Sequence, residues 1–370
     1  MKRALIISIK TAPGLPKEFF LIGNHLKSLG YNVEYLLNFE YDRFILPQIK
    51  EDNVIHFVKM SNNMVRSYFI EWKNIRQEII RKCGRAIYDY ICIYNPHPLC
   101  HRLMEFFYKK NPKSIRSVVL HEPYVPFKER YLYGLSGYIK ILFLDYFSQL
   151  LLRNCTDVIL PSKQAEKLYQ MMPYKRQKLR THIVPLLLTS EEERERKIRD
   201  NKYIAFVGTI NKARDIKGLL LIADKIYQKW PNIKFRILTR QNINIKSKNI
   251  EVIKKDFILD DEISNFVQDS LALFLTHTVA AQSGNVPVAY RVGTPIICFN
   301  VEGITQHIDF GKTGYIIDKD NIELDFNRAI EYLINHEDEM RANCIAYFET
   351  VFSQKNISKL YEWLEDKKEQ

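Results

Sequence analysis

The segment LALFLTHTVAAQSGNVPVAYRVGTPIICF, residues 271–299, places two short apolar runs around a polar loop and a helical stretch. Continuous apolar runs of this length are typical of strands that are buried on both faces of a parallel sheet. Between the runs, Asn285 or Ser283 is a suitable helix N-cap, and Pro287 stands near the first helical turn. A strand, a helix and a second strand in this order indicate a β-α-β unit, and therefore an α/β fold.

The loop in this segment, Ser283-Gly284-Asn285-Val286-Pro287, is a candidate phosphate-binding turn. Gly284 has no side chain to block a ligand, and the backbone N–H groups at a helix start can bind a phosphate. An ordinary capped helix is the alternative, and such helices are more common than phosphate sites.

The same alternation continues in both directions and predicts two doubly wound parallel sheets. We expect strands at residues 4–9, 32–37, 54–58, 90–94, 117–121, 157–160, 203–207, 234–238, 250–253, 271–276, 294–299 and 314–317. We expect helices at residues 18–29, 64–83, 98–108, 138–153, 163–169, 218–229, 259–268, 286–292, 304–310, 324–335 and 337–366.

A polar stretch, TSEEERERKIRD at residues 189–200, interrupts this alternation. We interpret it as a solvated connector between domains. The predicted domains are therefore residues 1–190 and residues 201–350, followed by a C-terminal helix and tail at residues 351–370. A surface helix within a single domain is the alternative.

The composition is that of an ordinary globular chain, with 46% hydrophobic and 26% charged residues among 370. The 55 basic and 43 acidic residues leave a net charge of +12, which favours an anionic partner such as a phosphorylated substrate or a membrane surface. No zinc-finger spacing or RNA-binding motif accompanies the basic residues, so nucleic acid is not expected. The six cysteines lack C-x-x-C spacing and several lie in apolar runs, which predicts core thiols in a reducing compartment.

The most apolar segment, residues 131–153, is dense in Tyr, Leu, Ile and Phe. Lys140 and Asp145 interrupt it, so it falls short of the uncharged length that a membrane span requires. We interpret it as a core helix, in preference to an apolar surface that faces a bilayer beside Lys128, Arg130 and Lys140. The chain is therefore expected to be cytoplasmic and at most peripheral to the inner face of a membrane.

A second candidate site follows the apolar run at residues 203–207. Gly208 allows a tight turn at this point, and a helix is expected to begin near Gly218. Arg214 and Lys217 then lie close to the helix N-terminus, where two cations beside exposed N–H groups would neutralise a diphosphate. A strand, turn and helix with solvated basic residues explains the pattern equally well.

Two further candidates lie in the first half of the chain. His121 and Glu122 come at the end of a predicted strand, where α/β enzymes place reactive groups. A histidine there can donate a hydrogen bond to a substrate or exchange a proton. Gly14 follows the first strand and suits close backbone approach to a ligand, although a plain connecting loop is an equal alternative. His277 is interpreted instead as a packed residue at the edge of the core.

Taken in order, these segments resemble the retaining GT-B glycosyltransferases of glycosyltransferase family 4. Landmarks similar to those of the family are VG at 207–208, KG at 217–218, SGNVP at 283–287, GTPII at 293–297, GKTGY at 311–315, LHE at 120–122 and VILPS at 158–162. The resemblance implies two Rossmann-like domains that face a central cleft, with the C-terminal helix packing back toward the N-terminal domain.

The resemblance also implies roles for individual residues. Lys217 would bind the diphosphate of a nucleotide-sugar donor, and His121 would contact the transferred sugar. Arg214 would be the partner cation, because Thr209 stands where the family usually has an arginine. These charges would stabilise the leaving nucleoside diphosphate without a metal ion or other cofactor. The remaining residues implied at the donor site are Gly208, Ser283, Gly284, Asn285, Val286 and Gly14.

The chain departs from the family at its glutamates. Two family glutamates fall on Ala280 and Val288 in this chain, and a third falls on Gln306. A valine cannot accept a hydrogen bond from the ribose of the donor. Glu302 is therefore the candidate for that contact, unless the donor is unusual or the protein is a non-catalytic member.

The predicted function is transfer of a sugar from a nucleotide-sugar donor to a glycan or lipid-linked acceptor. By the family resemblance, transfer would retain the anomeric configuration and serve bacterial cell-surface polysaccharide biosynthesis. The alternatives are a GT-B-shaped binding or partner subunit that has lost activity, and a sugar-nucleotide epimerase on the same fold.

Overall fold

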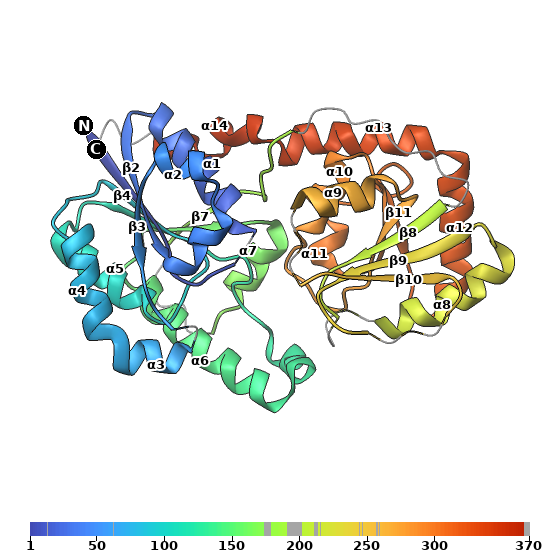
Figure 1. Cartoon of the computed structure of the whole chain (residues 1–370), viewed down its shortest axis with the longest axis horizontal. Helices are drawn as coiled ribbons and strands as arrows, with labels where there is room; N and C mark the ends of the chain where they lie inside the picture. Colours follow the sequence, from blue (N-terminus) through green and yellow to red (C-terminus); the bar gives the residue numbers. More distant parts are fainter. Residues whose placement is uncertain are drawn as a thin grey trace. The chain divides into compact units, whose positions relative to one another are not determined.

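The computed structural model describes residues 1–12, 14–61, 63–173, 179–190, 202–210, 214, 216–243, 245, 247–256, 258 and 260–365. The chain forms two compact units (Figure 1): unit 1 comprises Met1–Pro185 and Ile357–Gln370, and unit 2 comprises Leu186–Asn356. Leu188 belongs to unit 2 because its backbone pairs with that of Ser353. The predicted connector largely lies outside the described residues, which leave out residues 191–200.

Unit 1 is built on a parallel sheet that has seven strands within the described residues. The spatial order is that of a doubly wound sheet, in which the direction of winding reverses between β1 and β4. The strands, in this order, are β3 (Val54–Val58), β2 (Tyr31–Asn38), β1 (Lys2–Ser8), β4 (Tyr90–Ile93), β5 (Ile115–Val119), β6 (Asp157–Leu160) and β7 (Arg180–Ile183).

Unit 2 repeats the arrangement with six strands in the part of the chain that the structure describes, all parallel. Here the winding reverses between β8 and β11. The strands, in spatial order, are β10 (Ile250–Lys254), β9 (Ile233–Thr239), β8 (Lys202–Val207), β11 (Ala272–Leu275), β12 (Ile296–Phe299) and β13 (Gly314–Ile317). The prediction of two doubly wound parallel sheets is confirmed.

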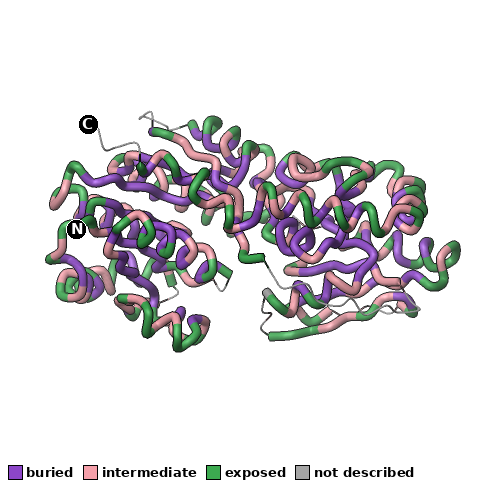
Figure 2. Tube along the Cα trace, turned by 90° about the horizontal axis from the view of Figure 1, so that it is seen from above, coloured by how far each residue is buried: buried purple, intermediate pink, exposed green. Residues whose placement is uncertain are grey.

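Helices connect the strands of each sheet. Figure 2 shows buried segments in the interior of both units, with exposed segments on the outer helices. The helices of unit 1 are α1 (Leu15–Ser28), η1 (Phe39–Phe44), α2 (Pro47–Glu51), α3 (Met64–Arg66), η2 (Ser67–Glu71), α4 (Trp72–Lys82), α5 (Cys100–Lys110), η3 (Phe127–Tyr133), α6 (Gly134–Leu152), α7 (Lys163–Gln170), α14 (Ile357–Leu360) and η6 (Glu362–Leu364). Those of unit 2 are α8 (Ile216–Lys229), α9 (Asp260–Gln268), α10 (Asn285–Arg291), α11 (Glu302–Thr305), α12 (Ile322–Asn335), α13 (Glu337–Tyr347), η4 (Phe348–Phe352) and η5 (Gln354–Asn356).

The cysteines are all free and buried, as the sequence predicts for core thiols. Burial raises the pKa of the Cys92 thiol to about 11, and that of the Cys298 thiol to about 12. Both thiols are therefore protonated at neutral pH and are poor nucleophiles.

The C-terminal segment differs from its prediction as one helix over residues 337–366. The helical run ends at Ser353, which is extended (φ −67°, ψ 138°) and fully buried, because its backbone pairs with Leu188 instead of continuing the helix. Beyond it the chain joins unit 1, where Tyr361 and Leu364 enter the core. The ring of Trp363 stacks on His182 of β7, with centroids 3.8 Å apart.

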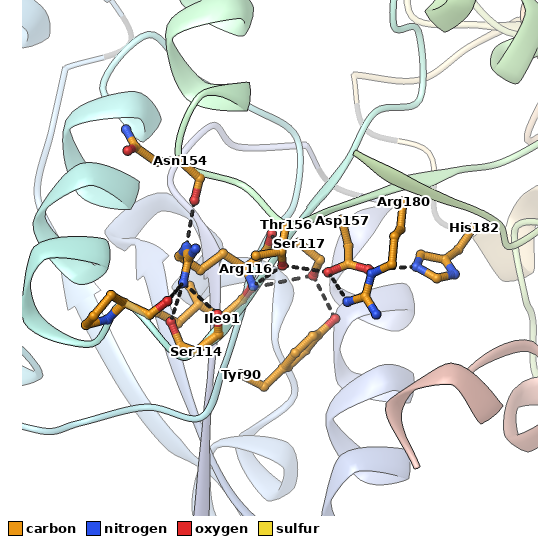
Figure 3. A network of polar contacts seen from close by, with 11 residues as sticks. Tyr90, Ile91, Ser114, Arg116, Ser117, Asn154, Thr156, Asp157, Arg180 and His182 are labelled. Carbon is orange, nitrogen blue, oxygen red and sulfur yellow. Dashed lines mark hydrogen bonds and ion pairs between the residues drawn. The ribbon is translucent and has the colours of Figure 1, made fainter. Parts of the chain in front are cut away.

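A buried carboxylate ties the far edge of the unit 1 sheet together (Figure 3). Asp157 of β6 pairs with His182 and Arg180 of β7, each at 2.8 Å, and accepts a hydrogen bond from Thr156. Burial alone would raise the pKa of Asp157, but the hydrogen bonds from these partners lower it. The strand β7 is absent from our sequence expectations, because its RTHI run is short and half polar.

A second buried carboxylate, Glu34 of β2, predicts acid sensitivity of unit 1. Burial alone would raise its pKa, but hydrogen bonds with His56, Arg3 and Tyr88 lower the pKa from 4.5 to about 2. The stabilisation, of order 3 kcal/mol, is therefore complete above pH 4.5 and is lost as the pH falls toward 2. Urea unfolding at a series of pH values measures it.

The Glu34→Gln variant is expected to be less stable than the parent at pH 6 and to lose less further stability on acidification. Glu51→Gln, which changes an exposed carboxylate at the end of α2, is the control and is expected to behave like the parent. Equal acid dependence in all three proteins would contradict the assignment.

The helix α6 corrects our interpretation of residues 131–153 as a core helix. Among the described residues one helix, Phe127–Leu152, is long and apolar enough to cross a membrane by length and composition, yet only a small part of it is buried in the protein. Its buried side chains are Phe147, Leu151 and Leu152 near its C-terminal end. The helix packs on α5, and its Phe147 also meets Tyr68 of η2, but these contacts leave most of its apolar side chains uncovered.

Candidate functional site

In unit 2 the point where the winding reverses lies between β8 and β11, and ligands of doubly wound sheets bind beyond the carboxyl ends of such strands. Gly208 follows β8 directly and has a φ of 121°, a conformation that side-chain-bearing residues rarely adopt. A Cβ atom at this position would lie 2.0 Å from Nη1 of Arg214. The backbone conformation therefore favours glycine here, and the guanidinium of Arg214 occupies the space that a side chain would fill.

Arg214 and Asn285 converge on the last carbonyl of β8. Nη1 of Arg214 donates to the oxygen of Val207 at 3.1 Å, and Nδ2 of Asn285 donates to the same oxygen at 3.0 Å. Two predicted segments that are far apart in the sequence are thus joined at one atom.

The remaining predicted residues of this segment lie nearby along the chain. Thr209 is exposed, and Lys217 is an exposed residue in the first turn of α8. Residues 211–213 and 215 lie outside the described residues. Exposed cations at the start of a helix are placed to meet an anion from solvent.

His277 belongs to the same cluster. Its backbone forms an antiparallel bridge with that of Arg214, directly after β11. Burial, together with the charge of Arg214, lowers the pKa of His277 to about 3. It is therefore neutral at physiological pH, and its 6% exposure agrees with our interpretation as a packed residue at the core edge.

Gln241 is a contributor that our reading of the sequence missed. It follows β9, and its amide accepts from the backbone N–H of Ile210 at 2.6 Å and donates to the carbonyl of Ile210 at 3.0 Å. This two-point contact holds the loop after β8. Its position directly after a predicted strand is the signal that could have identified it.

The start of α10 differs in detail from the expectation. Gly284 is the N-cap, with no side-chain cap, and neither Asn285 nor Ser283 fills that position. The N–H of Val286 donates to the carbonyl of Ser283 at 3.1 Å, and that of Asn285 is 3.4 Å from Oγ of Ser283. In this conformation these two N–H groups face Ser283 because the chain turns tightly at Gly284.

Glu302 begins α11 and is exposed. The next residue, Gly303, packs so closely on the loop after β11 that a Cβ atom would lie 2.0 Å from the oxygen of Ala280. Glu302 is therefore held beside the loop in which Ala280 replaces one of the expected glutamates. Val288, at the position of the other, lies in α10, is 6% exposed and packs in the core of unit 2. The side chain of Gln306 hydrogen-bonds to the carbonyl of Gly303.

In unit 1, His121 lies just beyond the carboxyl end of β5. Its Nε2 atom is 3.8 Å from a carboxylate oxygen of Glu18, in the first turn of α1, and Gly14 is the N-cap of that helix. Burial and the charge of Lys10 lower the pKa of His121 to about 4, so the ring is neutral at pH 7. The side chain of His121 thus lies close to the start of α1, the helix that follows Gly14.

Two residues after β4 complete this edge and were not predicted. Asn95 has a φ of 50°, and its amide donates to the carbonyl of Lys10 at 3.1 Å. His97 is buried, accepts at Nδ1 from the N–H of Leu99 at 3.2 Å, and has its pKa lowered to about 4 by burial and Lys10. The run Asn-Pro-His-Pro directly after a predicted strand is the signal for them.

The described residues contain no group of three or more His, Cys, Asp or Glu side chains arranged to hold a metal ion. The charged residues at the carboxyl edge of unit 2 include the predicted Arg214, Lys217 and Glu302. This edge can bind an anionic group and accept a hydrogen bond from a hydroxyl.

The sequence of this chain is similar to those of known glycosyltransferases. The sequence model of the family "Glycosyl transferases group 1" matches residues 189–351. The capsular polysaccharide biosynthesis glycosyltransferase CapM of Staphylococcus aureus is 29% identical over 159 residues, which are 40% of each protein. The match thus spans about two fifths of the length of that relative.

Solved structures are similar over nearly the whole chain. Sucrose-phosphate synthase of Thermosynechococcus elongatus has a TM-score of 0.73 at 12% identity, and the match covers 98% of this chain and 99% of that one. HepE of Anabaena in complex with UDP-glucose has a TM-score of 0.68 at 11% identity and covers 99% and 100%. The pneumococcal O-GlcNAc transferase GtfA in complex with UDP and GlcNAc has a TM-score of 0.68 at 11% identity and covers 99% and 98%. These similarities confirm the GT-B fold class.

Proposed function

We propose that this chain, whose residues 189–351 match the sequence model of the glycosyl transferases group 1 family, is a glycosyltransferase that uses a nucleotide-sugar donor. The acceptor is a glycan or a lipid-linked sugar, and the product serves bacterial cell-surface polysaccharide biosynthesis. The similarity to a capsular polysaccharide glycosyltransferase supports this context. Transfer proceeds with retention, and the protein works in the cytoplasm, peripheral to the membrane.

The observation that supports the proposal most directly is the position of the Arg214 side chain. Its guanidinium is held on the last carbonyl of β8 beside Asn285, in the space that the glycine at position 208 leaves open. With Lys217 in the first turn of α8, it supplies fixed positive charge where winding reverses in the sheet. Fixed charge at this place stabilises the negative charge that develops on a departing nucleoside diphosphate.

Other residues complete the donor and sugar contacts. Glu302, held beside the loop after β11, accepts hydrogen bonds from the ribose in place of the absent glutamates. Thr209 and the turn at Ser283, Gly284, Asn285 and Val286 contact the phosphates, and α10 frees its first N–H groups from Ser283 when the donor binds. His121 of unit 1 donates a hydrogen bond to the transferred sugar, near Gly14.

Calorimetric titration with UDP, GDP and ADP, each with and without EDTA, tests the proposal. We expect one of the diphosphates to bind in both conditions, and the corresponding sugar nucleotides to be hydrolysed slowly without acceptor. Absence of binding by all three would overturn the donor site. Binding that disappears with EDTA would overturn the metal-independent mechanism.

The pH dependence of transfer tests the role of His121. Because its pKa is about 4, the ring stays neutral from pH 5.5 to 8, and kcat/KM is expected to show no inflection from this residue in that range and to fall toward pH 4. His121→Ala is expected to lower kcat/KM roughly 10- to 100-fold through loss of one hydrogen bond to the sugar.

The control for this experiment is His121→Asn, which keeps a side-chain donor and is expected to retain more activity than the alanine variant. Full activity of His121→Ala, with donor binding intact, would contradict a contact with the transferred sugar.

A second function is favoured by one observation, the burial of Val288 in the core where a donor-binding glutamate is expected. In this second function the protein is a GT-B-shaped partner subunit without transferase activity. Such a protein would bind a nucleoside diphosphate weakly or not at all, and would release no product from any sugar nucleotide. The titration and hydrolysis experiments therefore separate the two functions.

A further inference from the structure

The helix α6 displays an apolar stripe to solvent. Leu135, Ile139, Leu142 and Tyr146 follow each other at helical spacing, and each is between 43% and 79% exposed. Residues at these intervals lie on one face of a helix. The opposite edge of the helix carries the buried side chains that pack in unit 1, so the stripe points away from its own unit.

A second apolar group borders this stripe. Val65, Phe69 and Ile70, on the continuous helical stretch α3–η2, are 57%, 67% and 73% exposed. Two buried rings connect the groups beneath the surface: the centroid of Phe147 lies 5.2 Å from that of Tyr146 and 4.7 Å from that of Tyr68, which is 4.8 Å from Phe69. In Figure 1 α3 and α6 lie along the same lower edge of unit 1.

Cations flank the apolar groups. Lys128 and Lys140 are exposed on the η3–α6 segment, and Lys73 is exposed one turn after Phe69 and Ile70. Of the acidic residues nearby, Asp145 is paired with the buried Arg130 at 2.6 Å, Glu71 is paired with Arg66 at 2.8 Å, and Glu129 is half-buried beside Lys128. The outward charge of this surface is therefore dominated by lysine.

We propose that this surface, formed by the apolar residues of α3–η2 and α6 with Lys73, Lys128 and Lys140, docks on an anionic lipid bilayer. An apolar helix face flanked by basic residues lies in the headgroup region, with apolar side chains among the acyl chains and lysines at the lipid phosphates. The surface goes beyond sugar transfer and does not depend on the donor site. It rests on the proposed function only for its use, which is to bring unit 1 to a lipid-linked acceptor.

The surface lies on the bilayer and does not span it. The buried edge of α6 packs on α5, and Arg130 joins Asp145 of α6 to the segment that precedes the helix. Crossing a membrane would require these contacts to break and would place the Asp145 carboxylate in hydrocarbon.

Vesicle flotation with the full chain tests the inference, using phosphatidylcholine alone and phosphatidylcholine mixed with phosphatidylglycerol. We expect binding to the anionic vesicles, weakened by salt and reversed by carbonate washing. Leu135→Glu/Leu142→Glu and Lys128→Gln/Lys140→Gln are each expected to lower the bound fraction about tenfold or more. Leu324→Glu, at an exposed leucine of α12 in unit 2, is the matched control and is expected to bind as the parent does.

Several outcomes would overturn the inference: binding unaffected by the α6 variants, equal binding to neutral vesicles, or resistance to carbonate. A dimer in sedimentation velocity that the Leu135→Glu/Leu142→Glu variant dissolves, without vesicle binding by the parent, would identify a second copy as the occupant. Titration with UDP, GDP and ADP on the same variants keeps the two proposals apart. Intact diphosphate binding with lost flotation supports docking alone, and intact flotation without binding of UDP, GDP or ADP overturns only the donor site.

Discussion

Lys217→Ala is expected to lower kcat/KM for sugar transfer roughly 100- to 1,000-fold, the usual cost of removing one fixed charge or donor from a developing anion. Lys217 is exposed in the first turn of α8, beyond the carboxyl end of β8, where a diphosphate would also meet helix N–H groups. Because the lysine has no role in the core, the variant should fold normally. Steady-state kinetics and calorimetry with the preferred nucleoside diphosphate measure the effect.

The matched control is Lys229→Ala, which removes the same charge from the last turn of the same helix. A cation at the far end is remote from the β8 turn, so its loss is expected to leave kcat/KM unchanged within about twofold, as for a screened surface charge. Equal effects of the two substitutions would show that α8 contributes only general charge. No effect of either would contradict the assigned diphosphate site.

Arg130→Met is expected to destabilise unit 1 by about 3–5 kcal/mol, because it leaves the Asp145 carboxylate without its charged partner in a poorly solvated position. The guanidinium of Arg130 is fully buried, donates to Val125 and Asp145, and lies 4.2 Å from the ring centroid of Phe127. Burial already raises the pKa of Asp145 against the influence of Arg130, and without the arginine that pKa should rise further. Urea unfolding at pH 7 measures the loss.

The double variant Arg130→Met/Asp145→Leu separates two contributions to the free energy of unfolding: the penalty for burying an unpaired carboxylate, and the stabilisation that the ion pair itself provides. Replacing both partners by apolar residues removes the uncompensated carboxylate, so most of the stability is expected to return. A double variant as unstable as the single one would show that Arg130 acts through its packing on the aromatic rings.

Much of the fold was predictable from the sequence. Apolar runs of strand length alternate with amphipathic stretches, and such runs can be buried only in parallel sheets covered by helices, so two α/β units were predictable. Candidate residues at Gly208, Arg214 and His121 were predictable because they follow strands, and all carboxyl ends of a parallel sheet meet at one edge. Figure 1 shows both units built in this way.

Residues whose partners are distant in the sequence were not predictable. Which strand neighbours β1 or β8 depends on the crossovers, so the contacts of Asn95 with Lys10, and of Gln241 with Ile210, follow only from the assembled sheets. The strand β7 is short and half polar, and it persists because Asp157 of β6 pairs with its Arg180 and His182, and because Trp363 stacks on His182.

By itself the amino-acid sequence determined the two sheets, the glycine turn at Gly208 and the cations beside it, because these depend on local pattern and backbone sterics. Tertiary structure alone decided what α6 does. A helix that is apolar on all sides belongs to the core if neighbouring elements cover all of it. If they cover only part of it, the uncovered side chains form an apolar surface that a partner can bind. Here the neighbouring elements bury only the C-terminal part of the helix, so the side chains at Leu135 and Leu142 remain in solvent.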